Sequence, residues 1–287
     1  MRKEIKTGLL GGVLSGVIAG GTTLSFLLYL MKPNHKRDIS DFRGKMYAHR
    51  GLHGIVDGKW IPENSLVAFR KAKEHNLSVE LDVQMTKDRQ LVVFHDNNLR
   101  RMCGVYAKVK DLTYEELCQY PLKHSKEKIP LLKEVLKVLD HMDIICEIKN
   151  HNGNKNDEFC RLVYDQISSY QGCVCVESFS PFLMHWFYIN HPEIIRGQLS
   201  NRMSSREGAF FPVNFIMSHL LINRISKPDF IAYKFSDTKT FGYRLCKKMY
   251  QPFCVAWTVR GDEEISHAKK EFDTLIFELG HKKRHKN

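Results

Sequence analysis

The sequence lacks the motifs that identify nucleic-acid-binding and zinc-stabilised proteins. Its 287 residues contain no RNA-binding motif, no zinc-finger spacing and no basic heptad region. Nucleic acid therefore ranks last among the anionic partners that a net charge of +12 favours, behind a phospholipid surface and a phosphate-bearing substrate. The eight cysteines include no C-x-x-C pair, and the chain shows no internal repeat. No feature of the sequence indicates an obligate protein partner.

One long stretch of the chain has no charge at all. Residues 7–31 contain no charged side chain, and lysines and arginines lie on both sides. About 25 apolar residues suffice to cross a bilayer with some tilt. A cleaved signal peptide is the alternative, but its apolar region would be shorter and followed by a convincing A-x-A-like site. The sequence therefore predicts one retained transmembrane helix in a single-pass membrane protein.

The side of the membrane is predicted from two weaker signals. The basic residues after the apolar segment slightly outnumber those before it, which favours a cytoplasmic position for the rest of the chain. Several cysteines lie inside apolar runs, where a reduced cysteine behaves as a small hydrophobe. This placement favours a reducing compartment for the rest of the chain, which again means the cytoplasmic side. The composition then divides the chain into a basic N-terminus (1–6), the transmembrane helix (7–31), a polar linker (32–45), one α/β domain (46–280) and a basic tail (281–287).

Short apolar runs alternate with amphipathic helical patterns throughout the α/β domain. This alternation predicts a parallel sheet, and so many repeats favour a closed (β/α)8 barrel of the TIM type. The strand candidates are 45–48, 79–83, 91–94, 144–148, 173–176, 194–199, 230–233, 253–259 and 274–277. The set has one strand too many for the barrel. A turn signal at residues 86–89 predicts that 79–83 and 91–94 form a hairpin-like extension, so that one of the two is not a barrel strand.

Three acidic residues lie near the ends of predicted strands. Glu80 and Asp82 share one face because side chains two residues apart on a strand point to the same side, and Glu147 ends another strand. The carboxyl ends of barrel strands meet at one rim. Three hard oxygen donors suit Mg²⁺ or Ca²⁺ better than Zn²⁺. Structural ion pairs are the alternative, but the clustering of the acids beside two histidines favours a metal site.

Four further side chains have the chemistry needed to act on a phosphate. Lys149 shares a strand face with Glu147, so it can hold a phosphate oxygen beside the metal, and Arg50 can bind two such oxygens at once. His49 and His95 each follow an apolar run and neighbour a charged residue. Histidine has the intrinsic pKa needed to accept and donate a proton near neutral pH.

The order of these residues resembles the glycerophosphodiester phosphodiesterase family. The motifs that carry the resemblance are His49-Arg50-Gly51, Pro62-Glu63-Asn64-Ser65, Glu80-x-Asp82, Thr86-Lys87-Asp88, His95-Asp96, Glu147-Ile148-Lys149, Ser178-Phe179 and Trp257-Thr258-Val259. The resemblance extends over about residues 46–279 and implies a TIM-type barrel. It also implies metal-dependent hydrolysis of glycerophosphodiesters to glycerol 3-phosphate and an alcohol.

The resemblance assigns a role to each site residue by position. The acid/base pair is His49 and His95, the ligands of a Ca²⁺ or Mg²⁺ ion are Glu80, Asp82 and Glu147, the phosphate contacts are Arg50 and Lys149, and Glu63 supports the metal or a histidine. Two positions depart from the family pattern. Residues 273–278 replace a Gly-rich strand that ends in Asp, and Arg260 stands where Asn is common. We expect neither to touch the metal or histidine set, so that they affect the choice of alcohol instead.

Two rival interpretations remain open. A lysophospholipase D or phospholipase acting on membrane lipid would use the same residues and differ only in an apolar groove for the acyl chain. The apolar stretch around residues 210–221 could form such a wall, although it is more often core. A catalytically inactive membrane scaffold would keep the fold. The intact set of two histidines, three acids, an arginine and a lysine argues against the scaffold, since a scaffold does not need clustered buried charge.

Overall fold

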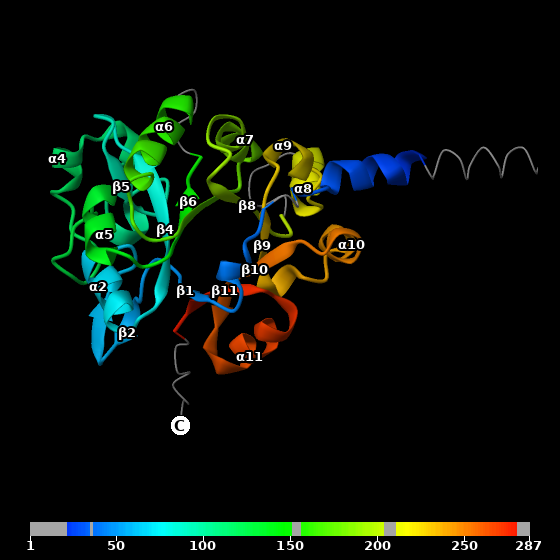
Figure 1. Cartoon of the computed structure of the whole chain (residues 1–287). Helices are drawn as coiled ribbons and strands as arrows, with labels where there is room; N and C mark the ends of the chain where they lie inside the picture. The colour runs from blue at the N-terminus through cyan, green and yellow to red at the C-terminus, as the bar shows by residue number, and fades with distance from the viewer. Residues whose placement is uncertain (1–21, 35–36, 151–155, 204–210, 280–287) are drawn as a thin grey trace, which may run out of the picture.

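A closed barrel of eight parallel strands forms the centre of the protein (Figure 1). The computed structural model describes residues 22–34, 37–150, 156–203 and 211–279. Around the barrel the strand order is β1, β4, β6, β7, β8, β9, β10 and β11, and β1 pairs with both β4 and β11 to close it. Every neighbouring pair is parallel. The predicted TIM-type α/β barrel is therefore confirmed.

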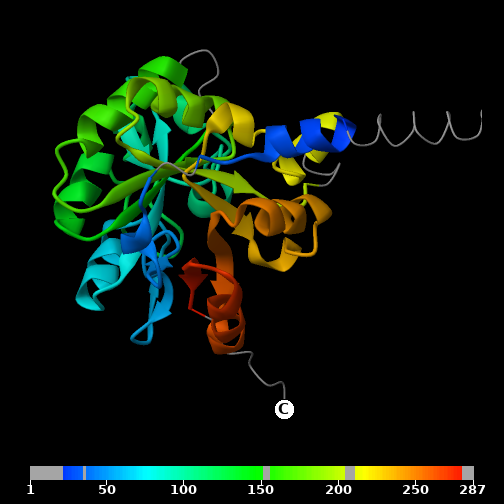
Figure 2. The same ribbon diagram turned by 45° about the vertical axis from the view of Figure 1, so that its right-hand side comes forward.

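The elements follow one another in strand–helix alternation. The barrel strands are β1 (Met46–Ala48), β4 (Ser78–Met85), β6 (Ile144–Ile148), β7 (Val174–Ser178), β8 (Ile195–Ser200), β9 (Phe230–Lys234), β10 (Phe253–Arg260) and β11 (Thr274–Glu278). The longer helices are α2 (Leu66–Glu74), α5 (Leu132–Leu139), α6 (Asn156–Ile167), α7 (Pro181–Asn190), α8 (Phe211–Ser218), α10 (Phe241–Tyr250) and α11 (Gly261–Glu271). These helices surround the barrel in both views (Figures 1 and 2).

The ninth predicted strand lies outside the barrel, as expected. β5 (Leu91–Val93) pairs antiparallel with the end of β4. It leads into short helices, α3 (Arg100–Cys103), η2 (Val109–Asp111) and α4 (Tyr114–Leu117), which enclose a small hydrophobic core of their own. The members of this second core are Val92, Phe94, Leu99, Met102, Val109, Leu117, Leu122, Ile129 and Leu131. His95 therefore follows a strand that belongs to this extension and not to the barrel wall.

The barrel interior changes from apolar to charged along the strand direction. Tyr47 on β1 and Ile145 on β6 belong to the apolar inner cluster. His49 follows Tyr47 by two residues, and Glu147 follows Ile145 by two residues. Because side chains two residues apart on a strand point to the same side, both also face the barrel interior. Phe42 of η1 (Ser40–Phe42) closes the amino end of the barrel, and its carbonyl accepts a hydrogen bond from Thr274 Oγ1. The charged residues are thus concentrated at the carboxyl end.

A helical segment formed by residues 22–31 packs against the barrel beside α8 and α9 (Asn223–Ser226), as Figures 1 and 2 show. Asn223 Nδ2 donates to the carbonyl of Met31, and the guanidinium of Arg224 lies 4.7 Å from the ring centre of Tyr29. Among the described ranges, no helix is both long and apolar enough to cross a bilayer. Most of the predicted transmembrane segment, residues 7–21, lies outside those ranges.

Candidate active site

The turn that follows β1 sets the position of two predicted site residues. Arg50 and Gly51 have φ angles of 55° and 76°, so the chain reverses direction directly after His49. A Cβ on Gly51 would lie 3.0 Å from the Cβ of Ala68 on α2, which is why this position needs glycine. The backbone N–H of Arg50 donates to Glu80 Oε2 over 3.0 Å. The turn therefore presents both its main chain and its side chains to β4.

The three predicted metal-binding acids are brought together. Glu80 and Asp82 lie on β4 and Glu147 on the neighbouring β6, where Asp82 and Glu147 are register partners. One carboxylate oxygen from each lies within 4.8 Å of the others, and the side chains are buried. A fourth buried carboxylate, Glu177 on β7, is the register partner of Glu147. The sequence interpretation missed Glu177.

The two predicted phosphate contacts lie against the same acids. Lys149 Nζ is 2.7 Å from both Asp82 Oδ1 and Glu147 Oε1. Arg50 Nε is 3.3 Å from Asp82 Oδ2, and its Nη1 donates to Glu63 Oε1 over 2.7 Å. A buried cation and a buried carboxylate stabilise each other's charged forms. Glu63, which was predicted to support the metal or a histidine, contacts Arg50 and Arg101 instead.

The three acids differ in the direction of their pKa shifts because their charged neighbours differ. Burial and the neighbouring carboxylates, Asp82 first, raise the pKa of Glu80 well above its ordinary value. The pKa of Glu147 is raised by burial although Lys149 opposes the shift. For Asp82, burial would raise the pKa, but Lys149 and Arg50 hold it well below its ordinary value. Like charges that cannot all ionise together are a feature of sites that bind a cation.

The residues present fit a hard divalent cation. The donor set of Glu80, Asp82 and Glu147 consists of carboxylate oxygens, which Mg²⁺ and Ca²⁺ prefer. The charged side chains of Lys149 and Arg50 contact Asp82 and Glu147, whereas Glu80 accepts from the backbone N–H of Arg50, so two cations face three carboxylates. A bound divalent ion would compensate the remaining negative charge. The raised pKa values of two of the acids are consistent with that need.

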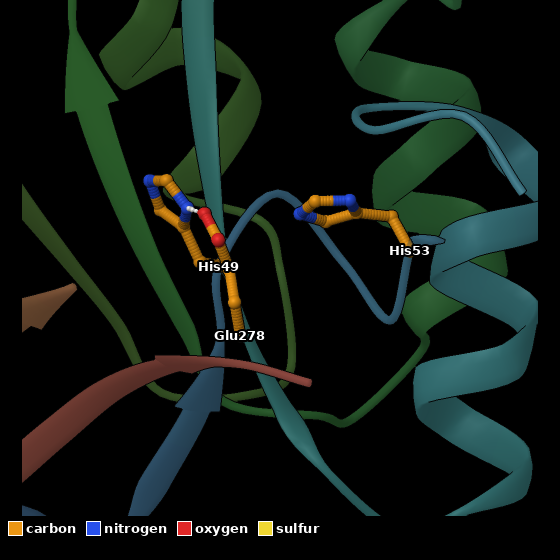
Figure 3. A group of neighbouring side chains, drawn as sticks. All are labelled: His49, His53 and Glu278. Carbon is orange, nitrogen blue, oxygen red and sulfur yellow. Dashed lines mark hydrogen bonds and ion pairs between the residues drawn. The ribbon is translucent and has the colours of Figure 1, made fainter. Parts of the chain in front are cut away.

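Glu278, at the end of β11, lies in the segment that departs from the family pattern, and it contacts a predicted site residue. Glu278 Oε1 lies 2.6 Å from His49 Nδ1, and Arg260 Nε donates to Glu278 Oε2 over 2.8 Å. The expectation that residues 273–278 stay clear of the histidine set is therefore wrong, whereas Arg260 contacts Glu278 and reaches the histidine only through it. Sequence spacing could not reveal this contact because the two strand ends meet only where the barrel closes. Figure 3 shows the carboxylate of Glu278 facing the ring of His49, with His53 on its other side.

The protonation of the His49–Glu278 pair follows from its environment. Burial would raise the pKa of Glu278, but hydrogen bonds from His49 and Arg260 keep it below its ordinary value. An ionised carboxylate can only accept, so Nδ1 of His49 carries the hydrogen. Burial lowers the pKa of His49 to about 4, which keeps the ring neutral at pH 7. Nε2, which lies 3.9 Å from Glu80 Oε2, is then left with its lone pair.

The second histidine is held by a different acid. His95 Nδ1 lies 2.7 Å from Asp96 Oδ1, and the guanidinium of Arg101 contacts both Asp96 and Glu63. Arg101 therefore links the loop that carries His95 to the Glu63–Arg50 pair. Burial would raise the pKa of Glu63, but Arg101 and Arg50 lower it to about 2. The sequence interpretation missed Arg101, which follows no strand and has no motif around it.

A cavity connects the second histidine to the acids. Its volume is about 340 Å³, and its walls include His95, Glu147, Lys149 and Phe179. A second cavity of about 370 Å³ lies beside Arg50, Glu63 and Arg101. All of the predicted site residues therefore lie in one connected network of contacts or along a shared cavity. That arrangement can hold an anionic group between cations and place a proton-transfer group on two sides of it.

Comparison with known proteins identifies relatives of the same kind. The model of the glycerophosphoryl diester phosphodiesterase family matches residues 49–232. A glycerophosphodiester phosphodiesterase from Bacillus altitudinis is 40% identical over 116 residues, which cover 37% of this chain and 45% of that protein. Human lysophospholipase D GDPD1 is 34% identical over 148 residues, which cover 46% of each. The chain thus spans about half the length of the curated relatives it matches.

Solved structures share the fold over most of the chain. The glycerophosphodiester phosphodiesterase from Thermotoga maritima is 26% identical, with a TM-score of 0.60 over 81% of this chain and 93% of that one. A phosphodiesterase from Oleispira antarctica, solved with its product sn-glycerol-3-phosphate, has a TM-score of 0.66 over 83% and 94% at 21% identity. At that identity the likeness shows the fold alone. The family model covers more than half of the chain, so the protein belongs to the glycerophosphoryl diester phosphodiesterase family.

Proposed function

We propose that the protein hydrolyses glycerophosphodiesters to glycerol 3-phosphate and an alcohol. The observation that carries the proposal is the joining of three buried acids, two cations and a carboxylate-held histidine at one end of the barrel. Such a group is costly to bury unless it binds an anion and a cation. The family relationship and the relatives named as glycerophosphodiester phosphodiesterases support the same reaction.

The roles of the charged residues follow from their contacts. A hard divalent cation held by Glu80, Asp82 and Glu147 would polarise the phosphoryl group and stabilise the charge that develops on it. Arg50 and Lys149 already lie beside these acids and offer hydrogen-bond donors to a phosphate bound there. Glu63 and Asp82 hold the Arg50 side chain in place. The cations therefore neutralise the diester without having to reorganise.

The two histidines have different environments, which suggests different roles. His49 is buried, neutral and held at Nδ1 by Glu278, so Nε2 is free to accept a proton from the nucleophile. His95 is about one-third exposed, and its Nδ1 lies 2.7 Å from Asp96 Oδ1. We therefore assign the base to His49 and the acid, which protonates the departing alkoxide, to His95. The nucleophile is a water molecule or a neighbouring hydroxyl of the substrate.

A direct assay tests the proposed reaction. The purified full-length protein would be incubated with a panel of glycerophosphodiesters in the presence of Mg²⁺ or Ca²⁺, and the release of glycerol 3-phosphate would be measured. We expect turnover with at least one diester and roughly 10²–10⁴-fold less turnover from the His49→Ala variant. Absence of turnover on every diester with either ion, in protein that melts cooperatively, would contradict the proposal.

A lysophospholipid is the second candidate substrate. A cavity of about 870 Å³ lies beyond the ends of β8 and β9, and its walls include Met203, Phe211, Phe215 and Phe241. Phe211 and Phe241 are 72% and 70% exposed, and exposed apolar side chains that lie together mark ligand-binding grooves or membrane-binding surfaces. Human lysophospholipase D is among the relatives. Faster release of choline from lysophosphatidylcholine than from glycerophosphocholine, lost selectively in Phe215→Ser, would favour this candidate.

We also propose that residues 7–31 anchor the protein in a membrane. The proposal rests on the uncharged sequence and on exposed apolar side chains of its described part, among them Leu24 and Phe26. Membrane attachment is tested by flotation of the full-length protein with liposomes after an alkaline wash. A purified protein whose first residue lies near position 25–35 would instead show a cleaved signal peptide. Labelling of a single introduced surface cysteine in intact cells would give the side, which we expect to be cytoplasmic.

A further inference from the structure

A second cluster of side chains that could bind a metal lies next to the cluster of Glu80, Asp82 and Glu147. His49, His53 and Glu278 each direct one ligand atom to a common region, and these atoms lie within 4.8 Å of one another. Figure 3 shows that the residues come from the end of β1, the loop after it and the end of β11. This cluster contains two imidazoles, whereas the acidic cluster contains none. The two clusters therefore differ in the metal that they favour.

The side chain of His53 has no role in the reaction proposed above. Its Nε2 atom is buried, and within the described ranges it has no hydrogen-bond partner. The ring reaches toward Glu278 from the side opposite to His49 (Figure 3), and the centres of the two histidine rings are 6.5 Å apart. A buried ring nitrogen without a partner is unfavourable unless it binds something. A soft-to-borderline cation is a ligand that its lone pair can take.

We propose that His49, His53 and Glu278 form a Zn²⁺-binding site that inhibits the enzyme. Two histidines and one carboxylate with a fourth position left open are a known ligand set for zinc. Bond lengths of about 2.0–2.2 Å place tetrahedral ligand atoms roughly 3.3 Å apart. The 2.6 Å contact between His49 Nδ1 and Glu278 Oε1 must therefore open slightly, and His53 must approach. Arg260 stays on the other oxygen of Glu278 and holds that carboxylate.

The proposed inhibition follows from the two nitrogens of His49. Zinc needs the lone pair of Nδ1, so the ring takes its other neutral tautomer, in which the proton that Nδ1 donated to Glu278 is carried by Nε2. With the proton on Nε2, that nitrogen can no longer accept one from the nucleophile. The inhibition rests on the proposed function, because it requires His49 as the base, whereas the binding of zinc does not. The acidic cluster can meanwhile keep its hard cation, since its ligands are different residues.

The test compares His53→Gln with His141→Gln, a histidine whose side chain is 71% exposed and far from any ligand set. Each protein is saturated with Mg²⁺ and titrated with Co²⁺, whose visible absorption reports tetrahedral nitrogen ligands, and with Zn²⁺ against a chromogenic indicator. We expect the wild type and His141→Gln to bind one Zn²⁺ in addition to Mg²⁺. We expect His53→Gln to bind it at least 10-fold more weakly, since even outer-shell partners of a metal are worth roughly 10–100-fold in affinity.

Activity provides an independent measurement. Zn²⁺ added over excess Mg²⁺ should inhibit the wild type and His141→Gln alike, and His53→Gln should keep its basal turnover while needing at least 10-fold more Zn²⁺ for half inhibition. Equal Zn²⁺ affinity in all three proteins would overturn the site. Zinc binding that disappears in His53→Gln without any change in inhibition would overturn the inhibitory role. If no diester is turned over, the proposed function fails while the Co²⁺ and indicator titrations still decide the site.

Discussion

Nδ1 of His49 lies 2.6 Å from Oε1 of Glu278, although 229 positions separate the two residues in the chain. The contact joins the first and last strands of the barrel at the point where they pair. Glu278 in turn accepts a hydrogen bond from Arg260. The orientation of the proposed base therefore depends on a residue at the far end of the domain.

Replacing Glu278 with Gln should lower turnover by about 10- to 100-fold with little change in KM. The amide can no longer fix the Nδ1–H tautomer of His49, so fewer rings present a lone pair at Nε2. Steady-state kinetics would measure the effect, with Glu278→Asp as the control that keeps a carboxylate. Recovery of most of the turnover by Asp is expected. An unaltered turnover in Glu278→Gln would show that the contact does not position the base.

The pH profile should carry the signature of the buried ring. Burial lowers the pKa of His49 to about 4, so the base is neutral above that pH and is protonated, and inactive, below it. The acidic limb of kcat/KM should therefore lie well below the ordinary histidine pKa of about 6.5. Since Glu278 raises the pKa of His49, its replacement by Gln should move this limb to still lower pH. A wild-type limb near pH 6.5 would contradict a buried base.

Removal of divalent cations should abolish activity, and addition of Mg²⁺ or Ca²⁺ should restore it. Asp82→Asn should lose cation affinity because it removes one of three ligands, and a cation-dependent rise in melting temperature would report that binding without any assay. Glu177→Gln is a matched buried control. Burial raises the pKa of Glu177 well above its ordinary value, and Glu177 is not one of the three predicted metal ligands, so Glu177→Gln should cost less cation affinity than Asp82→Asn. Full activity of the EDTA-treated protein would end the metal assignment.

His95→Ala should respond to the leaving group and His49→Ala should not. Each variant should lose roughly 10²–10⁴-fold on a glycerophosphodiester, the usual contribution of one acid or base group. A nitrophenyl leaving group departs without protonation, so it should restore much of the turnover of the variant that lacks the acid. Comparing both variants on both substrates makes the measurement. Rescue of His49→Ala instead would exchange the two roles, and rescue of neither would mean that the histidines do not act as a pair.

Adding a methyl group at Gly197 on β8 should destabilise the fold. A Cβ at this position would lie 2.1 Å from a ring carbon of Phe230 on β9, inside the barrel. Gly197→Ala should therefore lower the free energy of unfolding by roughly 1–3 kcal/mol, as overpacked cores do. Thermal unfolding would measure it, and Phe230→Leu in the same chain should recover part of the loss. Additive losses in the double variant would show that the two residues do not compete for space.

Sequence alone predicted most of the barrel and the positions of its charged residues. The reason is physical: Glu80 and Asp82 lie inside the apolar strand β4 and Glu147 lies next to the end of β6, and parallel strands of a barrel deliver their carboxyl ends to one rim. The antiparallel position of β5 also followed from a local turn signal at residues 86–89. Predictions of this kind need only the period of a strand and the direction of the chain.

The partners of these residues were harder to find. Glu278 and Arg101 act through long side chains whose reach depends on the packed structure and not on spacing. The hairpin of β2 (Gly54–Val56) and β3 (Lys59–Ile61) did have a signal, because Asp57 and Gly58 form a two-residue turn with φ angles of 50° and 75°. The strand prediction did not include this hairpin.

The extension that begins with β5 attaches the two proposed catalytic histidines to different parts of the structure. His49 follows the barrel strand β1, whereas His95 follows β5, whose Val92 packs into the separate cluster around Leu99 and Leu117 while Leu91 and Val93 pack into the main core. Regions with their own small core can open without global unfolding. Amide protons of this extension should therefore exchange with deuterium faster than those of the barrel strands. Catalysis would then fail at a lower temperature than the fold, because the proposed proton donor lies on this extension.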